Sequence, residues 1–329
     1  MKNLETKFAG LELCNPIIVS SCSLTGDVNG VRTFTDVSVG AVVLKSLFEE
    51  DIIRESAVLN QASTHTEADD YLQAYIAAEA LSNYINLIKE SKKLSAFTKI
   101  IASINCSNSG EWVEYARAIE LAGADALELN VMTIASDAMM ADGELEKRHI
   151  AIAKSVCEVV NIPVIMKLGT MLSNPSSLVS RLAAYGVSGF VLFNRAYPID
   201  IDIEQMKYTH GSILGSIDDL STPLRHVAIA SASNPNSSFS LSGSVHSGEC
   251  IIKAILAGAA TVSVCSILYR QGADATQWIA DALNRVRDWQ TKHNYESIES
   301  FRGLMNNSVE EHSDTVMRSQ FLKHFSAFI

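Results

Sequence analysis

The sequence predicts a (β/α)8 barrel, and three observations support this fold class. Eight short apolar runs rich in Val, Ile and Leu recur along the chain, separated by segments with helical spacing of apolar residues. The runs lack strict alternation of apolar and polar residues, which is typical of parallel strands buried on both faces. A length of 329 residues suits one such barrel with insertions. A doubly wound open sheet is the alternative arrangement of the same elements.

The predicted strands follow one another along most of the chain. A short stretch at 5–13 precedes them, and we expect it to form a hairpin that closes the bottom of the barrel. The strands are predicted at 15–22, 39–45, 99–105, 126–130, 163–168, 189–194, 239–245 and 261–266.

The predicted helices carry apolar residues at i, i+3, i+4 and i+7, and several end in glycine. The clearest are 111–124, 143–160, 175–187 and 247–259. Two longer segments, 46–70 and 195–222, are predicted to be elaborated loops on the C-terminal face, where loops shape active sites. We predict one domain, 1–329, with the barrel at about 14–290 and a C-terminal appendage at about 291–329.

Composition and charge restrict the partners that we expect. The chain is 47% hydrophobic and 19% charged, so it can bury a large core. A net charge of −11 without a block of basic residues argues against nucleic acid or an anionic membrane surface. The longest weakly polar stretch, 254–268, is shorter than the roughly 18 to 20 apolar residues of a membrane span. Six dispersed cysteines without a C-x-x-C pair indicate reduced thiols and hence a cytoplasmic protein.

Polar residues gather at the predicted C-terminal ends of the strands, where barrels carry their catalytic groups. Neither histidine nor carboxylate ends a strand, which disfavours a metal site and paired-carboxylate chemistry. The set suits an electron-rich anion held by cations, amides and backbone N–H groups. Its members are Ser20, Ser21, Cys22, Lys45, Asn105, Cys106, Asn130, Lys167, Asn194, Ser242, Gly243, Ser244, Cys265 and Ser266.

The two lysines of this set each end an apolar strand. Burial of Lys45 or Lys167 would be costly without an anionic or polar partner, so both are expected to face such a group. Extension of each side chain to water is the alternative.

The last two strand ends predict a phosphate site. The segments 242–248 ("SGSVHSG") and 265–272 ("CSILYRQG") place small residues where a strand gives way to a helix. Small residues let the backbone approach a phosphate, and a helix N-terminus supplies free N–H groups. The loops after strands seven and eight are the recurrent phosphate site of barrels. The alternative is that Gly243 and Gly248 only make tight turns.

The strand ends resemble the flavin mononucleotide (FMN) barrel of the class 1 dihydroorotate dehydrogenases over roughly residues 5–272. The resemblance lies in "CNPIIVSSCSLTG", "GAVVLKSLF", "ALELN", "IPVIMKL" and "SGSVHSGECIIKAILAGAATVSVCSILY", in the family's order. It implies an oxidoreductase of pyrimidine biosynthesis that converts dihydroorotate to orotate, works without a membrane and forms a homodimer. It implies FMN contacts from Ser20, Ser21, Lys45, Asn105, Asn130, Lys167, Asn194, Ser242, Gly243, Ser244, Cys265 and Ser266.

The loop after the fourth strand departs from the family. Class 1 enzymes continue with Asn-Leu-Ser-Cys-Pro-Asn, whose Cys removes the C5 proton and whose last Asn binds the pyrimidine. Here Asn130 is followed by Val-Met-Thr-Ile-Ala, so Thr133 stands at the position of the base and Ala135 at that of the pyrimidine ligand. A threonine hydroxyl is a poor base without a neighbouring one. The sequence therefore predicts FMN binding with a substrate that can differ from dihydroorotate.

The candidate catalytic residues are Thr133, Cys106 and Lys45, with Tyr197 and His246 as weaker candidates for proton transfer. Lys45, Asn194 and Arg195 are the candidates for binding a small-molecule substrate, although Arg195 could equally pack within its loop. Two other functions stay open: a flavin-binding barrel without turnover, and a phosphate-binding lyase or isomerase in which Lys167 forms a Schiff base.

Overall fold

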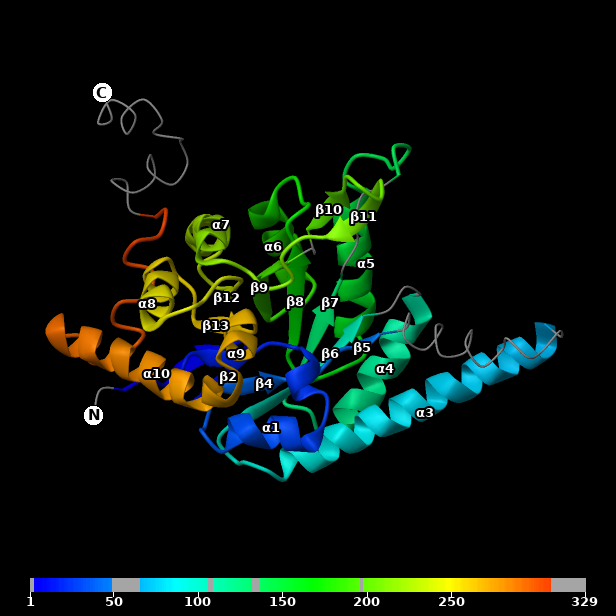
Figure 1. Ribbon diagram of the computed structural model, residues 1–329, viewed down its shortest axis with the longest axis horizontal. Coiled ribbons are helices and arrows are strands. Elements are labelled where there is room, and N and C mark those ends of the chain that lie inside the picture. Colours follow the sequence, from blue (N-terminus) through cyan, green and yellow to red (C-terminus); the bar gives the residue numbers. More distant parts are fainter. Residues whose placement is uncertain (1–2, 49–65, 106–108, 132–136, 196–197, 309–329) are drawn as a thin grey trace.

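Figure 1 shows the computed structural model, in which helices surround a central barrel of strands. The structure describes residues 3–48, 66–105, 109–131, 137–195 and 198–308. The predicted (β/α)8 barrel is confirmed: β3 and β13 pair at the seam between the first and last strands, and β4 pairs with β6 to close the sheet. Its eight parallel strands are β3 (Ile17–Val19), β4 (Ala41–Val43), β6 (Lys99–Asn105), β7 (Ala126–Asn130), β8 (Val164–Gly169), β9 (Gly189–Asn194), β12 (Ser238–Ser242) and β13 (Thr261–Val264).

The main helices alternate with these strands. Local capping starts several of them: Asn174 accepts a hydrogen bond from the backbone of Ser177, and Pro175 takes the first position of its helix. Among the described helices, none is both long and apolar enough to span a membrane. They are α1 (Val28–Thr35), α3 (Thr66–Lys92), α4 (Ser109–Ala122), α5 (Glu144–Cys157), α6 (Pro175–Ala184), α7 (Ser221–Ser233), α8 (Gly248–Leu256), α9 (Ser266–Gln271) and α10 (Ala275–Lys292).

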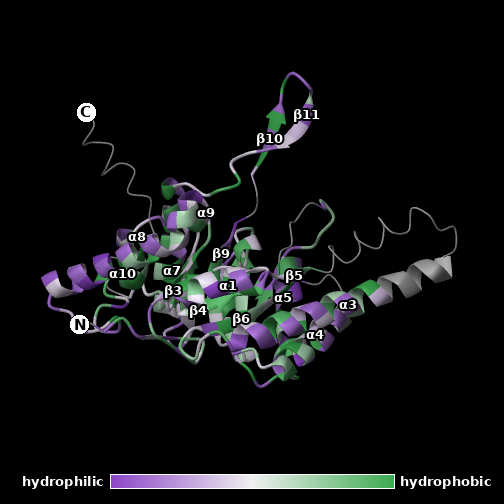
Figure 2. Cartoon of the chain, turned by 60° about the horizontal axis from the view of Figure 1, so that its bottom comes forward, coloured by the Kyte–Doolittle hydropathy of each residue, from purple (hydrophilic) through white to green (hydrophobic). Residues whose placement is uncertain are grey.

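The two segments predicted as elaborated loops contain regular structure. In the first, β5 (Leu47–Phe48) pairs with the end of β6, and α3 begins at Thr66, so the loop prediction for 66–70 is wrong. The sequence of α3 holds no glycine or proline and many good helix formers, which explains a helix of 27 residues. The second contains the hairpin of β10 (Ile199–Asp202) and β11 (Lys207–His210), which projects from the barrel (Figure 2). Short 3-10 helices lie at Ser23–Thr25, Ile217–Leu220 and Gly272–Asp274.

The predicted N-terminal hairpin is present as β1 (Thr6–Phe8) and β2 (Leu11–Leu13). Its Phe8, Ala9 and Leu13 are buried and cluster with apolar side chains of the barrel strands, among them Ile18 and Ile101. A Cβ atom on Gly189 would lie 2.8 Å from the Cβ of Ala9, so only glycine fits at that point of β9. The hairpin therefore closes the N-terminal end of the barrel.

The barrel interior changes from apolar to polar along the strands. Successive side chains of a strand point to opposite faces. On β7, Leu127 and Leu129 belong to the outer core together with the helices, whereas Ala126 belongs to the apolar cluster against the hairpin. Glu128 and Asn130 follow on the inner side, both buried. The polar residues are thereby concentrated at the C-terminal end of the barrel.

The described part of the C-terminal appendage packs against the barrel helices. After α10, Ile298 and Phe301 are completely buried. The backbone N–H groups of Gly303 and Met305 donate hydrogen bonds to carbonyls at the end of α8, at 2.9 Å and 2.8 Å. Tyr295 stacks on the ring of Trp289. Residues 293–308 are therefore attached to the barrel through two buried side chains and backbone hydrogen bonds, while many of their other residues are exposed.

Candidate active site

Two adjoining cavities open at the C-terminal end of the barrel. The smaller has a volume of about 150 Å³ and lies against β12 and β13, and the larger, of about 590 Å³, reaches Lys45, Phe48 and Tyr269. They share part of their lining and so form one continuous site. The shared residues are Ser21, Lys167, Asn194, Arg195, Ile213, Cys265 and Ser266.

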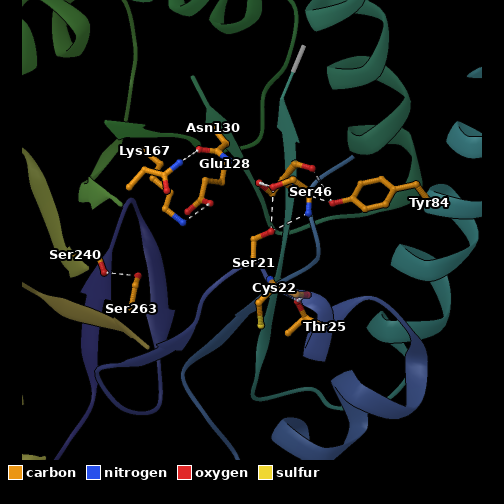
Figure 3. Close-up of polar contacts among 12 residues, drawn as sticks. Ser21, Cys22, Thr25, Ser46, Tyr84, Glu128, Asn130, Lys167, Ser240 and Ser263 are labelled. Atoms are coloured by element: carbon orange, nitrogen blue, oxygen red, sulfur yellow. Dashed lines mark hydrogen bonds and ion pairs between the residues drawn. The ribbon is translucent and has the colours of Figure 1, made fainter. Parts of the chain in front are cut away.

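A buried ion pair lies at the floor of this site. Lys167 lies on β8, two residues before the end of that strand, and Glu128 lies on the neighbouring strand β7. The two side chains are 9% and 3% exposed. Nζ of Lys167 and Oε1 of Glu128 are 3.9 Å apart (Figure 3), too far for a hydrogen bond. Burial raises the pKa of Glu128, and the nearby Lys167 and a hydrogen bond with Ser103 partly offset that rise. The ammonium group is thus held by charge attraction while its N–H donors remain for other acceptors.

Sequence reasoning did not find Glu128. Glu128 is two residues before the end of β7, so it falls outside the set of strand-end residues predicted from the sequence. The signal was available, because a spacing of two places Glu128 on the same side of the strand as Asn130. Residues that lie two positions before a strand end, on the same inward-facing side, are therefore further candidates for the site.

Two asparagine amides meet beside Lys167. Nδ2 of Asn194 donates a hydrogen bond to Oδ1 of Asn130 at 2.6 Å, and both residues line the larger cavity. They come from β9 and β7, the strands on either side of β8. The hydrogen bond fixes the orientation of Asn130, which leaves its amide N–H groups at the rim of the site.

A chain of hydroxyl groups connects β3, the turn before β5 and β6 (Figure 3). Oγ of Ser46 lies 3.0 Å from Oγ of Ser21 and 2.8 Å from Oγ of Ser103. The hydroxyl of Tyr84, on α3, accepts from the backbone N–H of Ser103 at 2.8 Å and donates to its carbonyl at 3.0 Å. Burial raises the pKa of Tyr84, so it stays protonated. This network, which the sequence did not predict, links Ser21 at the rim of the cavities to the helix α3 through hydrogen bonds.

The smaller cavity carries a cradle of small residues. Gly243 and Ser244 have positive φ values of 104° and 64°, and an added Cβ on Gly243 would meet open space. The open space beside Gly243 leaves the backbone of this turn accessible to a ligand. Oγ of Ser244 is buried and has no hydrogen-bond partner among the described residues. Burial lowers the pKa of the nearby His246, which is therefore neutral at physiological pH.

A loop at 212–215 covers this cradle. Arg195 donates from Nη1 to the carbonyls of Ser212 and Ile213 at 3.0 Å and 2.9 Å, and Arg270 donates to the carbonyl of Gly215 at 3.1 Å. The N–H of Gly215 donates to Oγ of Ser266 at 3.1 Å. Arg195 therefore packs within its loop and also lines both cavities, and its role in binding a substrate stays a prediction.

The structure places most expected site residues together and corrects one expectation. Every described residue expected to contact FMN lines one or both cavities except Asn105, which is buried at the end of β6. Lys45 is exposed at the rim of the larger cavity, so the expectation of a buried charge with a partner is wrong for it. Thr133, Cys106 and Tyr197 lie outside the described residues, and their roles stay predictions. No cluster of three potential metal ligands occurs within the described ranges.

Comparisons with known proteins agree with this architecture. The sequence profile of the dihydroorotate dehydrogenase family matches residues 3–286. A protein of Aeropyrum pernix provisionally named dihydroorotate dehydrogenase A (fumarate) is 26% identical over 92% of this chain and 95% of its own. The dihydroorotate dehydrogenase B (NAD(+)) catalytic subunit of Thermoplasma volcanium is 24% identical over 92% and 99% of the two chains. Chloroplastic dihydropyrimidine dehydrogenase (NADP(+)) of Arabidopsis thaliana is 23% identical over 97% and 80%.

The family match extends from the N-terminal hairpin through all eight strands of the barrel and includes both cavities and the Lys167–Glu128 pair. On this basis the chain belongs to the dihydroorotate dehydrogenase family.

Proposed function

We propose that this protein is an FMN-dependent oxidoreductase that acts on a CH–CH bond of a small cyclic substrate, as dihydroorotate dehydrogenases do. The observation that carries the proposal is the buried Lys167–Glu128 pair where the two cavities meet, beside the hydrogen-bonded Asn130 and Asn194. Enzymes of this family are flavoproteins. A buried cation with amide donors is the environment that a flavin ring requires as it gains negative charge.

The residues present fit FMN. The cradle at Gly243 and Ser244 offers backbone N–H groups and an unpartnered hydroxyl to a phosphate. Ser266 adds a hydroxyl from the start of α9. The larger cavity, at about 590 Å³, lies within the usual range for ligand pockets of about 300–1,000 Å³ and would hold the ring.

Bound FMN supplies the hydride acceptor, and the protein supplies charge, orientation and proton transfer. Lys167 would place its ammonium against the electron-rich side of the ring, with Glu128 holding that ammonium in position. Asn130 and Asn194, fixed by their mutual hydrogen bond, would donate to carbonyl oxygens of cofactor or substrate. Thr133 and Cys106 remain the proposed proton acceptors, with exposed Lys45 at the rim attracting an anionic substrate.

We propose a reduced pyrimidine ring as the substrate class. Dihydroorotate is the first candidate because the relatives named for it include two matched over nearly their full length. A dihydropyrimidine without the carboxylate is the second candidate. It is supported by the relative named dihydropyrimidine dehydrogenase and by Thr133 and Ala135 in place of the family's base and pyrimidine ligand.

The other two functions left open by the sequence have less support. A Schiff base needs a free amine, whereas the nitrogen of Lys167 is buried in an ion pair with Glu128. A protein that binds a flavin without turnover would use the same cofactor site. The bleaching experiment described below distinguishes this function from the proposed enzyme.

We also propose a cytoplasmic homodimer that takes part in pyrimidine metabolism. The five described cysteines are free thiols, as in a reducing compartment. Ile199, Ile201 and Tyr208 share one face of the β10–β11 hairpin, since Ile201 pairs with Tyr208, and all three are exposed. An exposed apolar face of this kind is typical of an interface. Light scattering should give a dimer mass, and Ile201→Asp should shift it toward the monomer.

The test of the proposed function starts from the purified protein. We expect a yellow protein that releases FMN on denaturation, with visible absorbance bleached anaerobically by dihydroorotate or by dihydrouracil. Lys167→Ala should lose most of the bound FMN or its reducibility. Lys92→Ala, which removes a partly buried ion pair with Asp125 at the other end of the barrel, should retain both. A colourless protein that cannot be reconstituted with FMN would refute the proposal, and bleaching by neither compound would favour binding without turnover.

A further inference from the structure

The carboxylate of Glu128 depends on a single cation. Its Oε1 lies 3.9 Å from Nζ of Lys167 and accepts no hydrogen bond within the part of the chain that the structure describes. The side chain is 3% exposed, so solvent does not supply the missing hydrogen bond. A buried carboxylate in this position stays ionised mainly through the charge of its partner. Any change that draws the charge of Lys167 elsewhere therefore favours protonation of Glu128.

We propose that Glu128 takes up a proton when a flavin bound at Lys167 is reduced, and releases it when the flavin is reoxidised. The inference rests on the proposed function, because the ring then gains its negative charge beside the same ammonium. Lys167 carries one positive charge, which the ring and the carboxylate would have to share. Protonation of the carboxylate removes one of the two negative groups at a position that is closed to solvent.

The uptake of one proton keeps the charge of the site balanced. Transfer of a hydride from the substrate adds two electrons and one proton to the ring, and hence one negative charge. Before the transfer, the charges of Lys167 and Glu128 cancel. After it, the ring and the ion pair together would carry one net negative charge if Glu128 stayed ionised. A proton from solvent on the carboxylate restores neutrality, so reduction takes up two electrons and two protons in place of two electrons and one.

Hydroxyl groups lead from the cavity to this carboxyl group. Ser103 stands opposite Glu128 in the register of β6 and β7, and its hydroxyl hydrogen-bonds the carboxylate. Oγ of Ser46 lies 2.8 Å from Oγ of Ser103 and 3.0 Å from Oγ of Ser21, which lines both cavities. Each hydroxyl can donate and accept, so a proton can pass along the chain by exchange of hydrogen bonds. Glu128 is therefore shielded from bulk water but connected to the cavity.

Among the described residues, two titratable side chains act on Glu128 from the elements around it. Lys167 on β8 opposes the rise in the pKa of Glu128 that burial causes. Burial, and to a smaller extent the charge of Glu128, raises the pKa of Tyr84 on α3. The hydroxyl of Tyr84 already donates to a backbone carbonyl at 3.0 Å and stays protonated. Glu128 is thus the member of this group whose protonation responds to a change of charge at Lys167.

The test is a redox titration of the FMN-loaded protein with dithionite and mediator dyes at pH values between about 6 and 8. The midpoint potential of the wild type should fall about twice as steeply with pH as that of Glu128→Gln, because the variant loses one of the two protons taken up. Glu128→Asp keeps an ionisable group and should restore the steep slope. Asp125→Asn, which removes a carboxylate paired with Lys92 at the other end of the barrel, should keep it as well.

Infrared difference spectra give a second readout that does not depend on catalysis. Reduction of the wild type should produce the C=O band of a protonated carboxylic acid, and Glu128→Gln should lack this band. Ser46→Ala interrupts the hydroxyl chain without removing the ion pair, so it should keep the band but slow its appearance after photoreduction by about tenfold. An unchanged rate in Ser46→Ala would overturn the proton path.

The outcomes separate this proposal from the proposed function. Equal slopes in the wild type and Glu128→Gln, or a carboxylic acid band that persists in the variant, would overturn the role of Glu128 and leave the proposed function intact. A protein that binds no FMN would overturn both. Because dithionite replaces the substrate as the reductant, the titration has the same expected result in a protein that binds FMN without turnover.

Discussion

Replacement of Lys167 by methionine tests the energetic role of the buried ion pair. The substitution keeps much of the side-chain volume and removes the charge that lies 3.9 Å from Glu128. At that distance and an effective dielectric constant of about 20, the lost attraction is about 4 kcal/mol. Glu128 can instead take up a proton, which limits the cost. The free energy needed to protonate a carboxylate of ordinary pKa 4.5 at a pH of about 7 is about 3.4 kcal/mol, and the loss of stability cannot exceed this value.

The sign of the pH dependence follows from the raised pKa of Glu128. A carboxyl group whose pKa is higher in the folded protein contributes stability below its ordinary pKa, and this contribution is lost as the pH rises through the folded value. Lys167→Met raises the pKa of Glu128 in the folded protein further, because the nearby positive charge is gone. As the pH rises, the variant therefore continues to lose stability up to a higher pH than the wild type does. The difference between wild type and variant should therefore be about 2–3 kcal/mol at about pH 7 and much smaller near pH 5.

Urea unfolding followed by circular dichroism at both pH values measures this difference. Adding Glu128→Gln to Lys167→Met should restore most of the stability lost at neutral pH, because the unpaired buried carboxylate is then gone. Lys92→Met is the matched control, and its partly exposed pair with Asp125 should contribute at most about 1 kcal/mol. An equal loss at both pH values, or no rescue by the second substitution, would refute this account of the pair.

Three further substitutions test the scaffold around the site. Tyr84→Phe removes both hydrogen bonds to the backbone of β6 and should lower the unfolding free energy by about 1–3 kcal/mol, with faster amide exchange on β6. Gly189→Ala brings a Cβ within 2.8 Å of Ala9 and should cost about 1–3 kcal/mol in urea unfolding, whereas Gly169→Ala meets open space and should cost much less. Burial lowers the pKa of His149, so its contribution to stability is present above 6.5 and lost as the pH falls through the folded value; His149→Gln should flatten that acid limb.

The sequence allowed the barrel to be predicted because buried parallel strands carry a strong local signal. Runs such as 99–105 and 189–194 match the bounds of β6 and β9, since nearly every residue in them is buried. The first turns of α3 carry mostly polar residues, so periodicity of apolar residues does not indicate where this helix begins. The hairpin of β10 and β11 is exposed at every strand residue except the half-buried Asp202, so burial leaves no apolar pattern there.

The candidate site was predicted only in part, for a physical reason. Strand ends such as Asn130, Lys167 and Asn194 could be aligned at one edge because parallel strands end together. The inward direction of Glu128 follows from its spacing of two to Asn130, but its approach to Lys167 and the Ser46–Ser103 contact depend on register between strands. Register between strands is set by tertiary contacts, and these contacts cannot be read from a single sequence.

The seam between β3 and β13 has a consequence for how the protein folds. Strand β3 ends at Val19 and β13 ends at Val264, so the seam joins segments almost a whole barrel apart in the chain. Such a contact closes a very long loop and forms late, because the chain entropy of loop closure is lost before the stabilising contacts are made. A nascent chain that stops before residue 261 holds Lys167 and Asn130 but lacks one wall of the binding site. Ligand binding can therefore stabilise this protein only after residues 261–267 have been synthesised and have joined the sheet, so the same seam closes the barrel and completes the binding site.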